Sequence, residues 1–248
     1  MNRDCIIVTG ASRGIGAAIA IALAQQGREV ICLSRSGALP KGVEVTPDLA
    51  RRFHSIKSDV TNADAMKTAM QTVANEGWNI KGLVNNAGMH IDAASADVAL
   101  DEWNQIMETN ATSVVIASQA AYPYMVKAQG GLIVNIGSFF DKLGVKRNLA
   151  YCASKAAVGA ITRVLAVEWA SKGIRCMNVA PGYIVTDLNL DAMAPDGPLR
   201  AYLDKRIPGK EPGKAADVGA LVASLFTPAG AFLNGETIYM DGAQSITH

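Results

Sequence analysis

Tyr151 and Lys155 stand four residues apart at the start of an apolar segment with helical spacing. This spacing places both side chains on one face of a helix, about one turn apart. A free phenol ionises at about pH 10, so acid–base chemistry near neutrality requires a shift of roughly three units, or about 4 kcal/mol. A lysine ammonium one turn away can stabilise the phenolate by that amount. Ser138 follows the apolar run 132–136, so its hydroxyl can converge with this pair, and the sequence predicts one catalytic group.

A glycine-rich turn follows the first predicted strand and opens the first predicted helix. Glycines permit a tight turn and a close approach to a ligand, while a helix N-terminus offers free N–H groups to a pyrophosphate. The spacing Gly-x-x-x-Gly-x-Gly differs from the Gly-x-Gly-x-x-Gly pattern of many dinucleotide-binding folds. Its position between strand and helix predicts dinucleotide binding rather than a turn without a ligand. The residues expected to contact the dinucleotide here are Gly10, Ser12, Arg13, Gly14, Ile15 and Gly16.

The end of the second predicted strand distinguishes the two nicotinamide dinucleotides. An acidic residue there would bind the free 2′-hydroxyl of NAD, whereas an arginine accommodates the 2′-phosphate of NADP. This strand ends in Ser34 and Arg35, with no carboxylate to repel a phosphate. Arg13 of the glycine turn can reach the same corner. The sequence therefore predicts NADP(H) as the cofactor in preference to NAD(H).

Size and composition indicate one domain, 1–248, with a large core. The chain has 248 residues, half of them hydrophobic, while charged residues make up 18% and nearly cancel at a net charge of +1. This balance argues against a nucleic-acid groove or a membrane-surface face. Four cysteines without Cys-x-x-Cys spacing indicate reduced thiols, and no metal site is predicted. An N-terminus that enters a strand directly, with no apolar stretch of about 18 residues, predicts a cytoplasmic protein.

Short apolar runs alternate with longer helical patterns along the chain. Candidate strands are Cys5–Val8, Val30–Leu33, Phe53–Ile56, Gly82–Asn85, Leu132–Ile136, Ile174–Val179 and Thr237–Met240. Helical patterns cover 14–26, 62–75, 101–127, 151–171 and 215–226. Strands this apolar are buried on both faces, which predicts an α/β fold with a parallel sheet covered on two sides. The long irregular segment at about 187–213 is predicted to be a substrate lid.

These motifs, in this order, resemble the short-chain dehydrogenase/reductase family over essentially the whole chain. The matching positions are the glycine turn, Asp59-Val60, Asn85-Asn86-Ala87-Gly88, Asn110, Ser138, Tyr151-x-x-x-Lys155, Pro181-Gly182 and Thr186. The resemblance implies a single-domain Rossmann fold with a doubly wound, seven-stranded parallel sheet and helices on both faces. It also implies a nicotinamide cofactor and a homotetramer.

The resemblance further implies a role for each matched catalytic residue. Tyr151 would be the general acid/base, and Ser138 would orient and polarise the substrate carbonyl. Lys155 would lower the pKa of Tyr151 and hold the nicotinamide ribose. Asn110 would hold a kink within 101–127 and a water that relays protons to Lys155. A helix-interior asparagine that only bonds the backbone is the alternative for Asn110.

The remaining matched residues are implied to surround the cofactor. Asp59 and Val60 would meet the adenine, although Asp59 could instead cap the helix that follows it. Asn86 could likewise be an ordinary turn residue. The residues implied to line the adenosine ribose are Asn86, Ala87 and Gly88. Those implied to bracket the nicotinamide carboxamide are Pro181, Gly182, Ile184 and Thr186.

The substrate is the least determined part of this interpretation. Phe140 and Tyr183, with Met89 and Phe139, adjoin motif residues and could line a mostly apolar pocket for a medium-sized ketone. Because Phe139 and Phe140 are successive, at most one is expected to face the substrate. His90 could line the same pocket, but we expect a plain surface histidine.

The predicted function is an NADP(H)-dependent oxidoreductase acting on a ketone or its secondary alcohol. The main alternative is a 3-oxoacyl-carrier-protein reductase, to which the segment 206–218 is similar. An acidic carrier protein requires a basic docking patch, and Lys127 and Lys172 are a thin one, so this partner is possible but not favoured. A non-catalytic NADP sensor is a further alternative, opposed by the presence of all four catalytic positions. An epimerase or dehydratase of nucleotide sugars is also opposed, because those chains are longer and have a different glycine spacing.

Overall fold

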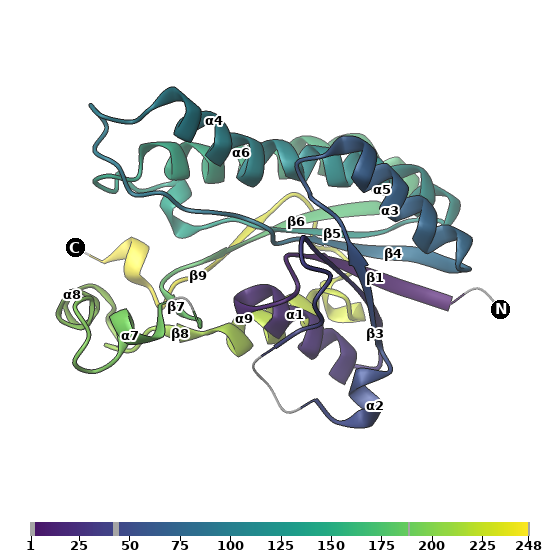
Figure 1. The fold of residues 1–248 in the computed structure, drawn as a ribbon, viewed down its shortest axis with the longest axis horizontal. Coiled ribbons are helices and arrows are strands. Elements are labelled where there is room, and N and C mark those ends of the chain that lie inside the picture. Colours follow the sequence, from purple (N-terminus) through teal and green to yellow (C-terminus); the bar gives the residue numbers. More distant parts are fainter. Residues whose placement is uncertain (1–2, 42–44, 188, 248) are drawn as a thin grey trace.

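The computed structural model describes residues 3–41, 45–187 and 189–247. Within them, seven parallel strands form one sheet in the order β3-β2-β1-β4-β5-β6-β9 (Figure 1). The strands are β1 (Arg3–Thr9), β2 (Glu29–Ser34), β3 (Phe53–Lys57), β4 (Trp78–Asn85), β5 (Gly131–Ile136), β6 (Ile174–Pro181) and β9 (Thr237–Met240). The predicted doubly wound, seven-stranded parallel sheet is confirmed.

Helices cover both faces of the sheet because successive strand residues alternate between two cores. In β1, Cys5 and Ile7 point into one buried cluster, and Ile6 and Val8 point into the other. Figure 1 shows α3, α4, α5 and α6 above the sheet, and α1 and α9 below it. The long helices on the two faces are α1 (Gly14–Gln25), α3 (Ala63–Asn75), α5 (Ser113–Lys127), α6 (Leu149–Trp169) and α9 (Ala215–Leu225).

The start of α3 is fixed by a side chain other than Asp59. Asn62 Oδ1 accepts a hydrogen bond of 2.9 Å from the Ala65 backbone N–H and caps the helix. Asp59 instead accepts hydrogen bonds from the backbone and the hydroxyl of Thr61, at 3.0 and 2.8 Å. Asp59 therefore shapes the turn before the helix and is not its cap.

The pattern predicted as one helix over 101–127 contains a break. Its first part is α4 (Leu100–Met107), followed by a π-helical turn at Glu108–Thr112 and then by α5. Helical periodicity continues across such a turn, so the sequence pattern does not reveal it. Asn110 lies in the middle of this turn, and its contacts are described below.

The segment predicted as an irregular lid contains regular elements. It includes α7 (Leu190–Met193) and α8 (Arg200–Arg206), while β7 (Ile184–Val185) pairs in parallel with β8 (Gly213–Lys214). Met193, Leu203 and Ile207 form a small buried cluster that holds it together. Leu188, which the predicted lid includes, lies outside the described residues.

One helix in the described part of the chain, Leu149–Lys172, is long and apolar enough to cross a membrane by length and composition. The prediction that no stretch approaches this limit overlooked it. This helix is α6 with its 3₁₀ extension, and 44% of its most apolar window is buried inside the protein. Val158 and Thr162 of this helix are buried, whereas Val164 and Val167 are exposed.

The strand order determines where a ligand can bind. From β1, the strands β2 and β3 extend the sheet towards one edge, and β4, β5, β6 and β9 extend it towards the other. The strand order therefore reverses between β1 and β4. In doubly wound sheets, ligands bind beyond the carboxyl ends of the strands at this reversal. In Figure 1 these ends point to the left, towards α7 and α8.

Candidate active site

The glycine turn after β1 adopts a conformation that requires glycine. Gly10 and Gly14 have φ angles of +64° and +56°, in the left-handed region. A Cβ atom on Gly16 would lie 2.2 Å from the Gly10 carbonyl oxygen. No side chain among the described residues caps the start of α1, so its first N–H groups remain available to an anion.

Thr9 and Asn86 join this turn to the end of β4. Thr9 Oγ1 accepts hydrogen bonds from the backbone N–H groups of Asn86 and Ala87, at 3.0 and 3.1 Å. Asn86 Nδ2 donates to the Thr9 carbonyl at 3.0 Å. The side-chain amide of Asn86 thus fixes the glycine turn, a role that its predicted position beside a ribose did not include. Beyond it, Gly88 is exposed at the carboxyl edge.

The corner beside β2 is positively charged. Ser34 is buried at the strand end, with its Oγ 3.4 Å from Ser36 Oγ, while Arg35 and Arg13 are exposed. Among the described residues, neither arginine forms an ion pair with a carboxylate. Hydrogen bonds from Thr61, aided by the charge of Arg35, hold the pKa of Asp59 below its usual value. Val60 follows Asp59 and packs on the core under the same corner.

Asn110 clamps the backbone of Met89 from inside the π-helical turn. Its Oδ1 accepts a hydrogen bond of 2.8 Å from the Met89 N–H, and its Nδ2 donates to the Met89 carbonyl at 2.9 Å. Nδ2 also donates to Ser154 Oγ on α6 at 3.1 Å. Asn110 is buried, so these bonds satisfy its amide and hold the segment after Gly88 in place.

A buried polar network supports the strands beneath the site. Asn85 Nδ2 donates to Ser118 Oγ at 3.2 Å and to Asn135 Oδ1 at 2.9 Å. Asn135 Nδ2 donates in turn to Thr162 Oγ1 at 2.9 Å. The network joins α5, β4, β5 and α6, so the elements that carry the predicted catalytic residues form one rigid support.

Lys155 is a buried cation beside Tyr151. Its Nζ donates to the Ile136 carbonyl at 2.8 Å and lies 5.7 Å from the centroid of the Tyr151 ring. Nζ is also 3.7 Å from the position of a Cβ atom on Gly88, so it faces the predicted cofactor segment. Burial lowers the pKa of Lys155 to about 8.

Tyr151 and Ser138 lie together at the end of β5. Burial raises the pKa of Tyr151 above its usual value, and hydrogen bonding with Ser138 offsets this only in part. Ser138 Oγ also accepts the Phe140 N–H at 3.3 Å, which fixes the hydroxyl at the start of a short 3₁₀ turn. The causes of this shift are burial, Ser138 and Cys152, and the effect of Lys155 on the pKa of Tyr151 stays a prediction. The phenol is therefore held in its protonated form.

Aromatic rings form one side of the space next to Tyr151. Phe140 meets the Tyr151 ring edge-on at 5.9 Å between centroids, and Tyr183 lies 6.1 Å from Phe140. Phe139 is buried and Phe140 is half-buried, so these successive residues differ in exposure. Burial raises the pKa of Tyr183, so this phenol too stays protonated.

His90 is exposed, as expected of a surface histidine, but its ring also contacts Tyr151. The two rings meet edge-on with centroids 5.0 Å apart. His90 Nε2 also hydrogen-bonds to Asn148 Oδ1. Sequence reasoning missed Asn148, which lies in a turn without any motif.

The segment after β6 returns towards the glycine turn. Pro181 ends β6, and the Gly182 N–H donates to the Met240 carbonyl at 2.9 Å. Ile184 is buried in β7, and the Thr186 N–H donates to Asn189 Oδ1 at 2.7 Å. Thr186 Cβ lies 3.7 Å from where a Cβ atom on Gly14 would be, so the segment closes over the start of α1.

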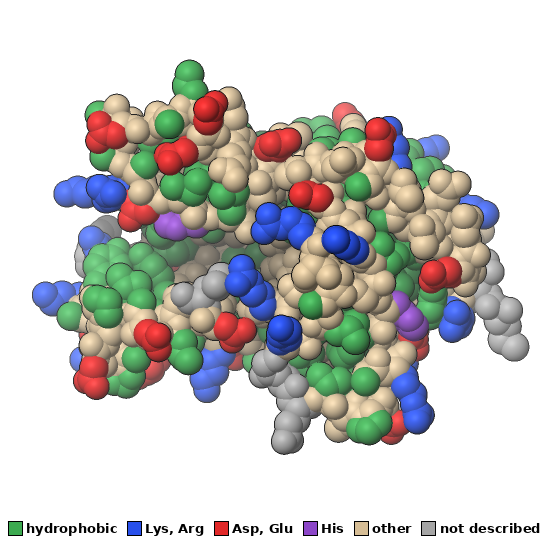
Figure 2. All heavy atoms as spheres, in the orientation of Figure 1, with side chains coloured by type: hydrophobic (Ala, Val, Ile, Leu, Met, Phe, Trp, Pro, Cys, Tyr) green, Lys and Arg blue, Asp and Glu red, His purple; other side chains and the backbone are tan. Residues whose placement is uncertain are grey.

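The predicted residues therefore gather at one edge of the sheet. Figure 2 shows this face of the molecule with a hollow between the upper helices and the lower elements, bordered by hydrophobic and basic side chains. A cavity of about 580 Å³ is lined by Tyr183 and lies between β7, α9 and the end of β9.

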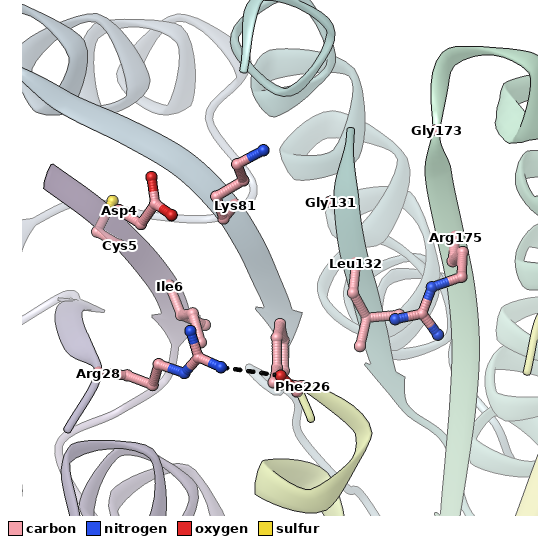
Figure 3. Close-up of a pocket in the computed structure, with 10 residues that line it drawn as sticks. All are labelled: Asp4, Cys5, Ile6, Arg28, Lys81, Gly131, Leu132, Gly173, Arg175 and Phe226. Atoms are coloured by element: carbon pink, nitrogen blue, oxygen red, sulfur yellow. Dashed lines mark hydrogen bonds between the residues drawn. The ribbon is translucent and has the colours of Figure 1, made fainter. Parts of the chain in front are cut away.

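Another cavity, of about 300 Å³, lies at the opposite, amino-terminal edge (Figure 3). Arg28, Lys81 and Arg175 line it, and each donates to a backbone carbonyl. Arg28 donates to the Phe226 carbonyl at 3.0 Å, and Arg175 donates to the Leu233 carbonyl at 3.1 Å. Lys81 donates to the Ala128 carbonyl. Phe226 and Ala128 end α9 and α5, where helix ends carry partial negative charge. These cations thus have a structural role, and the cavity contains none of the predicted site residues.

Comparison with known proteins agrees with this geometry. The family model described as short chain dehydrogenase matches residues 4–196. The chain is 35% identical over 237 residues to 3-oxoacyl-[acyl-carrier-protein] reductase of Vibrio cholerae, covering 95% of both chains. It is 32% identical to the enzyme of that name from Staphylococcus epidermidis, covering 98% of both.

Solved structures give a similar result. Aldohexose dehydrogenase of Thermoplasma acidophilum superposes with a TM-score of 0.87 at 32% identity, covering 99% of this chain and 96% of that chain. A short-chain type dehydrogenase/reductase from Mycobacterium marinum matches with the same TM-score and coverage at 31% identity.

Proposed function

This chain belongs to the short-chain dehydrogenase family and acts on alcohol or carbonyl groups, and from this premise we propose that it uses NADP(H) on a ketone or its secondary alcohol. The observation that carries the proposal is the convergence of Tyr151, Ser138 and Lys155 at the carboxyl edge, next to the glycine turn.

The residues at this edge fit a dinucleotide. A Cβ atom at Gly16 would fill the turn, the start of α1 lacks a side-chain cap, and Arg13 and Arg35 are free to meet a 2′-phosphate. The turn from Gly10 to Gly16 would hold the pyrophosphate, and Lys155 the nicotinamide ribose. By the family pattern we assign Asp59 and Val60 to the adenine, Asn86, Ala87 and Gly88 to its ribose, and Pro181, Gly182, Ile184 and Thr186 to the carboxamide.

When bound, the nicotinamide supplies the hydride that forms the new C–H bond in reduction, or accepts it in oxidation. Tyr151 gives its phenolic proton to the carbonyl oxygen, on which negative charge develops, and later regains a proton from solvent. Ser138 donates a hydrogen bond to the same oxygen. The raised pKa of Tyr151 makes the phenol a weaker acid, and the nearby positive charge of Lys155 is the group that would offset this effect. Lys155 stabilises the phenolate that forms, and Asn110 supports the adjacent segment and a proton-relaying water.

Two further features of the proposal concern assembly and location. Val164 and Val167 on α6 are 54% and 81% exposed, which supports an assembly, and we assign the homotetramer of the family. Light scattering that shows a stable monomer removes this assignment. The thiols Cys5, Cys32, Cys152 and Cys176 are all free, which supports a location in the reducing cytoplasm.

The test is turnover of NADPH and NADH against a panel of ketones, with secondary alcohols and NADP assayed in the reverse direction. The expected result is ketone turnover with a higher kcat/KM for NADPH. An equal or higher kcat/KM for NADH overturns the cofactor assignment. Tight NADPH binding without turnover of any substrate favours the sensor alternative.

A second candidate function comes from the relatives. Two of them, at 35% and 32% identity, are named 3-oxoacyl-[acyl-carrier-protein] reductases. A short 3-oxoacyl thioester therefore belongs in the panel. Turnover of this thioester well above every ketone makes the acyl-carrier-protein reductase the better assignment.

A further inference from the structure

We propose that His90 selects ketones that carry a hydroxyl group on the carbon next to the reacting carbonyl. This inference rests on the proposed function and narrows its substrate class. The feature that carries it is a hydrogen-bond acceptor, Nδ1 of the His90 ring, which packs edge-on against Tyr151.

The two rings against Tyr151 differ in chemistry. Phe140 meets it edge-on at 5.9 Å and 89°, and His90 meets it edge-on at 5.0 Å and 83°. Behind Phe140 lies Tyr183, so this side is aromatic. A carbonyl held by Tyr151 and Ser138 therefore has one substituent near the aromatic side and the other near an imidazole.

The hydrogen bonds of Asn148 determine which nitrogen of His90 carries the proton. Asn148 Nδ2 donates to the Lys146 carbonyl at 2.9 Å, which orients the amide and leaves Oδ1 as the acceptor towards His90. His90 Nε2 must then be the donor. In the neutral ring this leaves Nδ1 without a proton, as a free acceptor.

The backbone on both sides of this pair is fixed. The Ala93 N–H donates to the Arg147 carbonyl at 3.0 Å, and Arg147 Nε forms an ion pair with Asp92 Oδ1 at 2.6 Å. Asn148 itself is buried, and His90 is exposed. The ring is therefore positioned before a substrate arrives.

A free acceptor at this place discriminates between substrate substituents. A hydroxyl group can donate to Nδ1, whereas a plain methylene cannot. A thioester carbonyl only accepts hydrogen bonds, so it would face the lone pair of Nδ1 without a proton between them. The geometry thus favours an α-hydroxy ketone over both a plain ketone and a 3-oxoacyl thioester.

The experiment compares 2-hydroxycyclohexanone, cyclohexanone and a short 3-oxoacyl thioester with NADPH at pH 8. His90→Phe keeps the ring against Tyr151 but removes both nitrogens. His54→Phe makes the same change on β3, where His54 meets Glu29 and Trp78, and is the matched control. NADPH affinity and thermal unfolding verify that each variant is folded.

In the wild type, kcat/KM is expected to be about tenfold higher for the hydroxy ketone than for cyclohexanone, from one hydrogen bond. In His90→Phe the ratio is expected to approach one, through loss of hydroxy-ketone turnover alone, while His54→Phe keeps the wild-type ratio.

Three results overturn the inference while leaving the proposed function intact. The first is equal kcat/KM of the wild type for the two ketones, and the second is an unchanged ratio of these values in His90→Phe. The third is an equal fall in kcat/KM for both ketones in that variant, which would make His90 only a support of Tyr151. A wild-type protein that reduces neither ketone, with either cofactor, overturns the proposed function and this inference together.

Discussion

Lys155 Nζ lies 5.7 Å from the centroid of the Tyr151 ring while it donates a 2.8 Å hydrogen bond to the Ile136 carbonyl. Ile136 ends β5, the strand that leads to Ser138. The lysine is thus fixed by the strand that presents the serine as well as by its own helix. The three residues cannot move independently, which is the condition for a preorganised proton donor.

Tyr151→Phe tests the proposed proton donor directly. The ring and its contacts with His90 and Phe140 remain, but the proton is gone, so kcat is expected to fall by about 10²- to 10⁴-fold. NADPH affinity, measured by titration calorimetry, is expected to stay close to that of the wild type. Tyr122→Phe, which alters a phenol packed on Trp169, is the control. Normal turnover in Tyr151→Phe would sink the assignment.

Lys155→Met tests the effect of the buried charge on stability. Burial lowers the pKa of Lys155 from 10.5 to about 8 in the folded protein. The unfolded chain therefore binds this proton more tightly, and the charged folded form is destabilised by about 3 kcal/mol below pH 8. The penalty disappears as the pH rises from about 8 to about 10.5.

Urea unfolding of the wild type and Lys155→Met at pH 6.5, 8 and 9.5 measures this difference. The variant is expected to be more stable at pH 6.5, with an advantage that shrinks as the pH rises. Buried thiols such as Cys5 titrate in both proteins and cancel in the comparison. A variant that is less stable than the wild type at all three pH values contradicts the prediction.

Arg35→Asp tests the cofactor corner. The carboxylate would repel a 2′-phosphate and accept a hydrogen bond from a 2′-hydroxyl, so the NADPH-to-NADH ratio of kcat/KM is expected to fall at least tenfold, a change of about 1.4 kcal/mol. The control is Arg51→Asp, which makes the same change of charge at the exposed C-cap of α2 (Pro47–Ala50). An unchanged ratio places the phosphate elsewhere.

Asn110→Ala tests the clamp on Met89. The change leaves the Met89 N–H and carbonyl without their partners, so the free energy of unfolding is expected to fall by about 2–4 kcal/mol. NADPH affinity is expected to fall as well, because Gly88 loses its support. Asn104→Ala, on the exposed face of α4, controls for the helix change. Unfolding within about 0.5 kcal/mol of the wild type would show that the clamp is dispensable.

Gly16→Ala tests the glycine turn. The new Cβ would lie 2.2 Å from the Gly10 carbonyl oxygen and 2.4 Å from Asn86 Nδ2, so the turn must open. We expect a loss of about 1–3 kcal/mol in stability and of most NADPH affinity. Gly144→Ala is the control, since no atom lies within 4 Å of its added Cβ. Wild-type NADPH binding in Gly16→Ala contradicts the role of the turn.

The sheet could be predicted from the sequence because local patterns determine its strands. Apolar runs such as Ile174–Val179 lie within the observed strands, and alternation with helices fixes the parallel order. The candidate residues could be located for a related reason. Tyr151, Ser138 and the glycine turn each follow or open an element, and the carboxyl ends of parallel strands meet at one edge.

The parts that could not be predicted depend on contacts between distant residues. The π-helical turn is stabilised by a bond from Asn110 to Met89, 21 positions away. The side of the pocket beside His90 depends on Asn148, 58 positions away. The pKa of Tyr151 depends on burial by several elements, which a Tyr-x-x-x-Lys spacing does not contain. Spacing reports neighbours on one helix, whereas desolvation is a property of the whole fold.

The π-helical turn also sets a rule about chain length. Replacing it by an ordinary α-helical turn would require one residue fewer between α4 and α5. Deleting one residue from 108–112 would close the π-helical turn into an ordinary α-helical turn, and the side chains of α5 would keep their faces. Ser118 would then still meet Asn85, whereas the position from which Asn110 reaches Met89 would be lost. The extra residue of this turn therefore serves the segment after β4 and not the packing of α5.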